Sequence, residues 1–433
     1  MGGSAAAALC GLGAAPMARA ASRPTKLVVV FVEGGWDVTM SFAPRLDHDF
    51  IEGPRVDERP EVADDVEVLG SYGDIRVALN DCRVTLGNES YVKRPNARLF
   101  MDKWSSECCV VNGIWTGAVG HDTSTIRMQT GTQHNTNADL CAIVGHEFGA
   151  DVPLGYVAIA GVPFVGPYAA SSGQFGFNSQ LKLLFDKGLS MPAPVGLNLD
   201  YPLYAQSGAD EDAVQRFLRD RGDRWRDIRG DGSENSRRID DLFESYDRSE
   251  RFMEAAADQL SGLTLGEVPS FAQQGRLAAE FLAGDICKAV LLASTPGWDT
   301  HNDNAVQHGF YNTLFAGLDA LMTTLQDRGI LDETLVVVVS EMTRTPRINA
   351  NRGKDHWPHA TALLMGSGVR SRASLGGYSE LMESLPVSLE TGEPSEAGEL
   401  MRYDNFAAGL LEHLDIDPGK YLPSVAPMRG FVA

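Results

Sequence analysis

The sequence predicts an α/β fold in which a central, mostly parallel β-sheet is flanked by helices. Several short runs consist almost wholly of apolar residues, and a helical pattern separates two of them. Such runs are typical of strands that are covered on both faces, as in the parallel sheets of α/β proteins. The size agrees, because 433 residues with 43% hydrophobic content suffice for one large α/β domain or two smaller ones.

Five apolar runs are expected to form buried parallel strands. In chain order they are LVVVFV (27–32), CCVVNG (108–113), KAVLLA (288–293), TLVVVVS (334–340) and ATALLMG (360–366). Between the third and fourth runs, apolar residues recur at helical spacing, at Val306, Phe310, Leu314, Leu318, Leu321 and Leu325. Gly329 is suited to end this helix. Strand, helix and strand in this order make a βαβ unit.

The composition excludes one class of partner. A formal net charge of −21 argues against nucleic-acid binding, which requires basic side chains that displace counterions from phosphates. Beyond the N-terminal segment, no stretch is apolar enough to span a bilayer, so we expect no stable membrane span.

The N-terminal segment has features of an export signal. The small-residue stretch AAAALCGLGAAPMARA (5–20) ends in Ala18-Arg19-Ala20, the A-x-A pattern of a signal-peptidase site. It lacks the basic residues that usually precede such a stretch, so a flexible Ala-rich leader is the alternative. We expect residues 1–22 to be a leader, residues 23–433 to form one domain, and the mature protein to be periplasmic or extracellular.

One segment differs from the rest of this domain. Between Asp210 and Asp258 the chain holds fifteen acidic and ten basic residues and few apolar ones. Alternating charge of this kind is typical of solvated helices. We therefore expect residues 205–265 to form a helical insertion or cap.

Four of the apolar runs are followed at once by polar side chains that suit metal binding. They are Asp37 after the first run, His121 after the second, Asp299 and His301 after the third, and Glu341 and then His356 after the fourth. The carboxyl ends of parallel strands share one edge of a sheet, where α/β proteins build their sites. Carboxylate and imidazole donors without thiolates suit a first-row divalent metal.

Each of these residues also has a purely structural interpretation. Asp37, Asp299 and Asp303 could cap helices, and Thr123 or Ser124 could cap the helix after the second run. The histidines could bond backbone carbonyls. The recurrence of ligand-type residues at four separate strand ends favours the metal interpretation.

The motifs LVVVFVEGGWD, GWDTH and SEMTRTPRINANRGKDHWPHA resemble the DUF1501 family, a group of exported bacterial proteins placed in the alkaline phosphatase and sulfatase superfamily. The resemblance spans about residues 26–370 and implies an alkaline phosphatase-like fold. It also implies a divalent metal cofactor (zinc, manganese or calcium) and hydrolysis of an anionic phosphate or sulfate ester. Members often carry twin-arginine (Tat) export signals, which this N-terminus lacks.

The resemblance also implies roles for single residues. Asp37, Asp299, His301, Glu341 and His356 match the metal ligands, while Met342 stands where relatives have a ligand histidine. His121 falls in the position of the nucleophile, with Thr123 and Ser124 as alternatives nearby. Arg344 and Arg347 could bind an anionic substrate group or pair with carboxylates of the chain.

Three functions are compatible with these observations. The first is an exported metal-dependent hydrolase of phosphate or sulfate esters. The second is a non-catalytic structural or binding protein that retains a degenerate metal site, a view that Met342 favours. A metal-free Ser-His-Asp hydrolase ranks last, because the chain has no G-x-S-x-G motif.

Overall fold

The computed structural model describes residues 23–45, 48, 50–51, 68–81, 92–175, 208–229, 234–260, 269–294 and 297–433. The expected leader, residues 1–22, lies outside this part of the chain. Among the described helices, none is both long and apolar enough to cross a bilayer.

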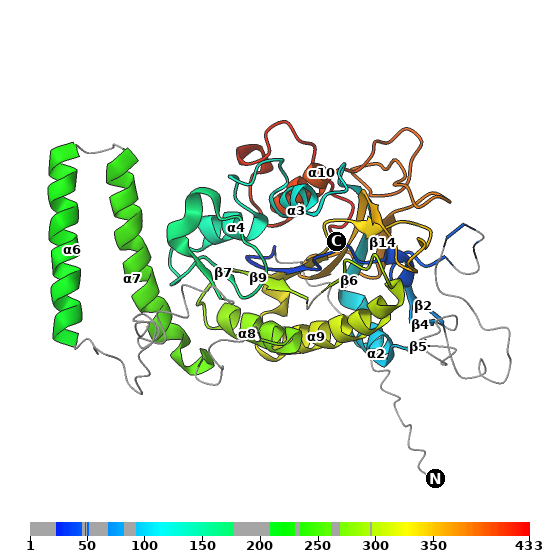
Figure 1. Ribbon diagram of the computed structural model, residues 1–433, viewed down its shortest axis with the longest axis horizontal. Coiled ribbons are helices and arrows are strands. Elements are labelled where there is room, and N and C mark those ends of the chain that lie inside the picture. Colours follow the sequence, from blue (N-terminus) through cyan, green and yellow to red (C-terminus); the bar gives the residue numbers. More distant parts are fainter. Residues whose placement is uncertain are drawn as a thin grey trace, which may run out of the picture.

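The centre of the molecule is an eight-stranded sheet with the order β14-β6-β13-β10-β1-β9-β7-β8 (Figure 1). Its strands are β1 (Lys26–Phe31), β6 (Cys108–Trp115), β7 (Tyr156–Ala158), β8 (Ser172–Gln174), β9 (Ala289–Ala293), β10 (Thr334–Val339), β13 (His359–Gly366) and β14 (Ala373–Gly376). All five apolar runs are strands of this sheet, which confirms the predicted α/β class.

The direction of one strand differs from the prediction. β13 is antiparallel to both of its neighbours, β10 and β6, whereas every other neighbouring pair in the sheet is parallel. The expectation that residues 360–366 form a parallel strand was therefore wrong. No crossover helix separates β10 from β13. The chain instead returns through a two-stranded hairpin of β11 (Thr343–Arg344) and β12 (His356–Trp357), and such a return reverses the strand direction.

The apolar runs form strands because both faces of the sheet are covered. In β1, Val28 and Val30 enter one hydrophobic core, while Leu27, Val29 and Phe31 enter the other. Side chains that alternate between the faces of a strand are all buried in this arrangement. Each fully buried aliphatic side chain contributes about 1.5–3 kcal/mol relative to an exposed one.

Two layers of helices cover the sheet (Figure 1). One face carries α2 (Pro95–Trp104), α8 (Phe271–Ala283) and α9 (Gln307–Asp327), and the other carries α3 (His121–Thr130), α4 (Leu140–Phe148) and α10 (Tyr403–His413). The predicted helix between the third and fourth runs is α9, and Gly329 follows it with φ +71°. Two small hairpins, β2 (Leu69–Tyr72) with β3 (Ile75–Ala78) and β4 (Asn80–Asp81) with β5 (Val92–Lys93), complete the described strands.

The charged segment forms two long helices, α6 (Gly208–Arg229) and α7 (Glu234–Leu260). In Figure 1 they stand beside the β7 end of the sheet, and α7 lies between α6 and the rest of the molecule. Arg248 and Arg251 of α7 donate hydrogen bonds to backbone carbonyls of residues 149–152, and Phe252 packs against Phe175 and Phe281. The pair projects outward from that end of the sheet.

Candidate metal centre

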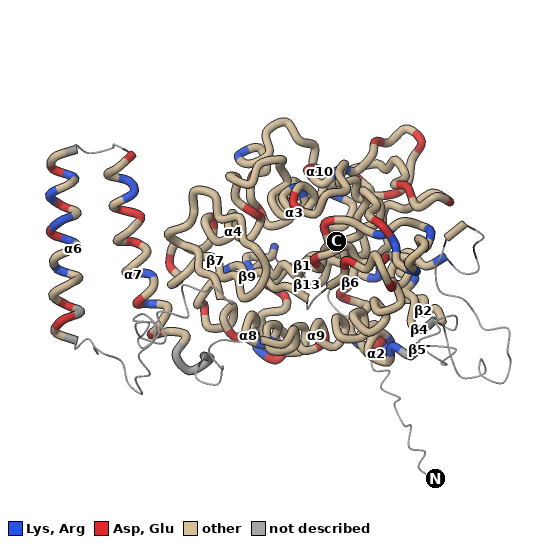
Figure 2. Tube along the Cα trace, viewed as in Figure 1, with Lys and Arg blue, Asp and Glu red and all other residues tan. Residues whose placement is uncertain are grey.

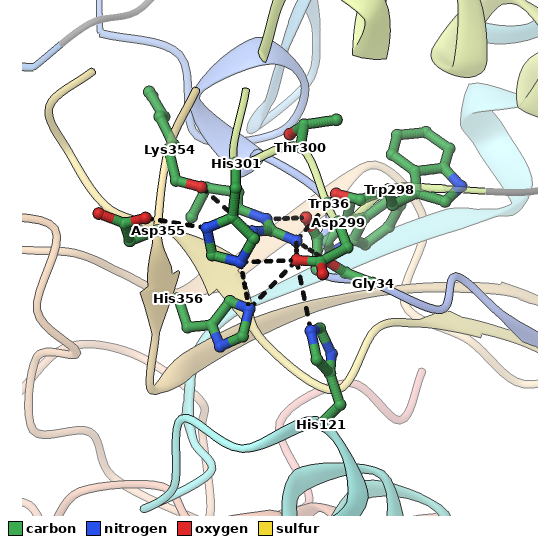
Figure 3. Close-up of polar contacts among 12 residues, drawn as sticks. Gly34, Trp36, His121, Trp298, Asp299, Thr300, His301, Lys354, Asp355 and His356 are labelled. Carbon is green, nitrogen blue, oxygen red and sulfur yellow. Dashed lines mark hydrogen bonds and ion pairs between the residues drawn. The ribbon is translucent and has the colours of Figure 1, made fainter. Parts of the chain in front are cut away.

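The side chain of Asp299 is the meeting point of three histidines from different parts of the chain (Figure 3). Its Oδ1 atom lies 3.0 Å from Nε2 of His301 and 3.1 Å from Nε2 of His356. The third histidine, His121, places its Nε2 atom 3.3 Å from the same oxygen. These four residues are termed the Asp299 centre.

The order of the strands explains why the centre forms. Asp299 and His301 follow β9, and His121 is the first residue of α3, in the connection after β6. These strands are parallel, so their carboxyl ends share one edge. His356 reaches the same edge for the opposite reason: it precedes β13, and an antiparallel strand begins where its parallel neighbours end.

The second ring nitrogen defines the tautomer of each histidine. In all three rings Nδ1 lies within hydrogen-bond distance of an oxygen that accepts, either a carbonyl or a carboxylate, so Nδ1 carries the proton. The pairs are His121 with Oε1 of Glu341 (2.7 Å), His301 with Oδ1 of Asp355 (2.8 Å) and His356 with the carbonyl of Val119 (2.6 Å). In the neutral ring, each Nε2 then presents a lone pair.

These lone pairs converge where a cation would be bound. Nε2 of His301 and Nε2 of His356 are only 2.9 Å apart, and two lone pairs cannot form a hydrogen bond without a proton between them. Nε2 of His121 is buried and has no hydrogen-bond partner within the described part of the chain. Donor atoms of His121, Asp299 and His356 all lie within 4.8 Å of one another. Three imidazoles and one carboxylate are a donor set that suits a tetrahedral divalent metal such as zinc.

The outer partners of the histidines have the arrangement that supports metal ligands. Carboxylates and carbonyls that accept from the distal ring nitrogen fix the orientation of a ligating imidazole. Glu341 is fully buried, and besides His121 it accepts from the backbone N–H of Gly34 (2.7 Å) and from Ser340 Oγ (2.9 Å). Its hydrogen bond raises the pKa of His121. Glu341, expected to be a ligand, therefore contacts a histidine of the centre from its outer side.

Arg344 forms an ion pair with Asp299. Its guanidinium is 2.7 Å from Oδ1 of Asp299 and donates to the backbone carbonyls of Gly34, Gly35, Trp298 and Lys354. Burial raises the pKa of Asp299, but its interactions with His356 and Arg344 outweigh burial and lower that pKa to about 2. Asp299 is therefore an anion at neutral pH.

Of the two roles left open for the arginines, pairing with a carboxylate of the chain is the one that the contacts of Arg344 match. Arg344 is 1% exposed, and its N–H groups donate to backbone carbonyls and to Asp299. Its guanidinium is therefore not placed to bind an anionic group of a substrate. Arg347 is exposed, and its guanidinium lies 5.0 Å from the ring centroid of Phe50.

Asp37 has a different environment from the one expected of a ligand. Its Oδ2 atom is 2.7 Å from Nζ of Lys354, and both side chains are fully buried. Asn304 donates to the same oxygen (2.6 Å), while Oδ1 caps the 3-10 turn Val38–Met40 through the N–H of Thr39 (3.1 Å). Asp37 thus has the capping role that the sequence left open, and an ammonium group of the protein neutralises it.

The candidate nucleophiles are separated by the structure. His121 faces Asp299, whereas Ser124 is buried and its hydroxyl donates to the carbonyl of Ala118 (3.0 Å). Thr123 is exposed in the first turn of α3. Of the three, only His121 belongs to the Asp299 centre.

Sequence reasoning missed three residues around the centre. Asp355 and Lys354 precede His356 directly, in the same motif, so their position was the available signal. Glu33 lies two residues after the end of β1, next to the buried Val32. Burial and the charge of Glu341 raise its pKa, which makes it a candidate proton donor or acceptor.

The fold and the centre define an α/β protein with a candidate metal site at the carboxyl edge of its sheet. The chain belongs to the DUF1501 family, whose model, described as a protein of unknown function, matches residues 24–387. No curated protein sequence matches the chain.

Solved structures with a similar fold include three whose names state an activity. The lipoteichoic acid synthase LtaP from Listeria monocytogenes has 10% identity and a TM-score of 0.40, with 95% of this chain and 77% of that chain covered. Alkaline phosphatase from the Antarctic bacterium TAB5 has 9% identity and a TM-score of 0.38, with 92% and 99% covered. The phosphonate monoester hydrolase of Agrobacterium radiobacter has 12% identity and a TM-score of 0.33, with 94% and 79% covered. These similarities concern the overall architecture and say nothing about the chemistry of the site.

Proposed function

We propose that this protein is an exported, metal-dependent hydrolase of phosphate or sulfate esters. The single observation that carries the proposal is the convergence of three Nε2 lone pairs on the Asp299 carboxylate, with every Nδ1 proton held by an outer acceptor. The ester class comes from the sequence resemblance to the alkaline phosphatase and sulfatase superfamily.

The Asp299 centre would hold the ion, and the donor set favours zinc or manganese. Calcium prefers oxygen ligands throughout, which three imidazoles do not offer. Such an ion, when bound, supplies a Lewis acid that neutralises charge on an ester oxygen. The centre is open to a ligand, since the side chains of Asp299 and His301 are 43% and 38% exposed.

The residues of the chain have separable tasks in this proposal. Glu341 and Asp355 orient histidines, and Arg344 orients Asp299. The first turn of α3 begins at His121, and N–H groups in a first helical turn favour an anionic group nearby. Glu33, with its raised pKa, is the candidate to transfer a proton to or from the leaving group. We assign His121 to metal binding rather than to nucleophilic attack.

A second function is a binding protein that retains a single metal and turns over nothing. The observations that favour it are Met342, which is fully buried, and Lys354, which already neutralises Asp37. Both features argue for one metal per chain rather than two.

Metal analysis together with an activity assay separates these functions. Purified mature protein is stripped with a chelator, reloaded with zinc or manganese, and assayed with an aryl phosphate and an aryl sulfate. We expect one equivalent of metal and metal-dependent turnover of at least one ester. His121→Ala should lose both, whereas His134→Ala, at an exposed loop histidine, serves as the matched control. Metal without turnover supports the binding protein, and absence of metal contradicts both functions.

The position of the nucleophile can be tested in the same assay. If Thr123→Ala abolishes turnover but retains the metal, the exposed hydroxyl is the nucleophile. Ser124→Ala should leave turnover intact, because the buried Ser124 hydroxyl donates a hydrogen bond to the carbonyl of Ala118.

A further inference from the structure

The α6–α7 hairpin has an apolar face that the rest of the described chain does not cover. On α6, four apolar side chains remain open to solvent: Val214 (48% exposed), Phe217 (55%), Trp225 (40%) and Ile228 (74%). At 100° per residue these four fall within an arc of about 80° on the helix. The exposed Arg221 falls within the same arc, so this is a narrow apolar stripe that contains one arginine.

The stripe continues from α6 onto α7. Gly222 marks the side of α6 that faces α7, because a side chain there would meet Phe243. The α6 stripe lies about a quarter turn from Gly222, and the exposed Leu242 (48%) lies about a quarter turn from Phe243. In both helices the exposed side chains are rotated in the same direction about the helix axis from the residue that faces the partner helix. Because α6 and α7 run antiparallel, equal rotations bring these side chains to the same side of the hairpin.

We propose that this face binds the same face of a second copy of the protein, forming a twofold dimer in which two α6 helices pack antiparallel. The helices interlock through their four exposed apolar side chains, and Leu242 extends the contact. An isologous contact of this kind closes after two subunits.

The charges of α6 favour antiparallel self-association (Figure 2). Its first eight residues hold three acidic side chains and no basic one, whereas the remaining fourteen hold six arginines and three aspartates. An antiparallel contact sets the acidic end of one helix against the arginine-rich part of its partner. A parallel contact would set like charges against each other.

The size of the face suits a stable dimer. A helix of 22 residues is about 33 Å long, and two adjacent helices are about 20 Å wide. A surface of this extent approaches the ~800 Å² that each partner contributes to a typical stable interface. Aromatic anchors such as Phe217 and Trp225, surrounded by charged residues, match the anatomy of such interfaces.

The charge balance argues against a lipid surface as the occupant. Helices that bind anionic membranes carry an excess of lysine and arginine on the polar face. Here α6 has as many acidic as basic residues, and α7 has eight acidic residues and four arginines. The whole chain carries a formal charge of −21.

Sedimentation velocity of the full mature chain between about 1 and 100 µM tests the proposal. We expect the parent to sediment as a dimer. The double variant Phe217→Glu, Ile228→Glu should be monomeric, with at least a hundredfold weaker dimerisation and an unchanged helical circular dichroism spectrum and melting temperature. Leu99→Glu, at an equally exposed apolar residue on α2 (65%), is the control that should stay dimeric.

A second variant addresses orientation. Asp210→Arg, on the same side of α6 as the stripe, should weaken the dimer several-fold, because the acidic end then repels the arginines of its partner. A parent that is monomeric at 100 µM overturns the proposal, as does a double variant that dimerises like the parent. A parent that binds phosphatidylglycerol vesicles through Phe217 and Ile228, and does not dimerise, overturns it in favour of a lipid surface.

Discussion

Replacing Glu341 by glutamine tests whether the outer carboxylate supports the metal centre. Glutamine has nearly the same shape, so its carbonyl oxygen can still accept from His121 and from the N–H of Gly34, while the negative charge is lost. A hydrogen bond to a charged group contributes about 1.5–3 kcal/mol and a neutral one about 0.5–1.5 kcal/mol. The difference, about 1–1.5 kcal/mol, corresponds to roughly a tenfold loss of metal affinity.

Two readouts distinguish this effect from general damage to the fold. Competition with a chromogenic chelator measures the Kd for zinc, and NMR titration of the metal-free protein measures the pKa of His121. Because the hydrogen bond that His121 donates to Glu341 is the main cause that raises this pKa, we expect the pKa of His121 to fall in the variant. Glu333→Gln, at an exposed glutamate that pairs with the buried Lys26, is the matched control. A Kd within twofold of the parent, with an unchanged His121 pKa, would refute the reasoning.

Three further predictions follow from the structure. Lys354→Met should cost about 3–5 kcal/mol of unfolding free energy in urea, because it leaves the buried Asp37 charge unpaired; Asp37→Asn added to it should restore most of the loss, and additive losses would contradict the pairing. Burial lowers the pKa of His359 from 6.5 to about 4, so the unfolded chain takes up a proton at a higher pH than the folded chain does. As the pH is lowered from 6.5 to 4, the free energy of unfolding should therefore fall by about 3 kcal/mol. A His359→Gln variant that keeps the same pH slope would show that the cause lies elsewhere. The mature chain should begin near Ala21 outside the cytoplasm, and N-terminal sequencing from native cells that finds an intact Met1 in the cytosol would rule this out.

Much of the fold could be predicted from the sequence because it depends on local patterns. An apolar run such as 27–32 is continuous only when both faces of a strand are buried, and the helix ending before Gly329 shows its period directly. The polar residues after strand ends were found in the same way. His121, Asp299, His301 and His356 were all named before any contact was known, and all four lie in one centre.

The directions and partners of these elements depend on residues far apart in the chain. An apolar run is the same in a parallel or an antiparallel strand, so the direction of β13 was set by the hairpin before it and by its pairing with β10 and β6. That direction brings His356 to the edge of the sheet that carries the Asp299 centre. The apolar face of the α6–α7 hairpin likewise depends on tertiary packing, because α7 covers the side of α6 that carries Gly222 and leaves the apolar stripe exposed.

The division between ligand and supporting residue was decided by tertiary structure alone. From sequence, Asp37, Asp299 and Glu341 are equivalent carboxylates after strands. In the folded chain Lys354, 317 positions further on, neutralises Asp37, while Glu341 is enclosed behind His121 and only Asp299 reaches the histidines. Local sequence determines which residues arrive at an edge, whereas the charge and burial around each carboxylate, which come from distant segments, determine what remains free to bind a cation.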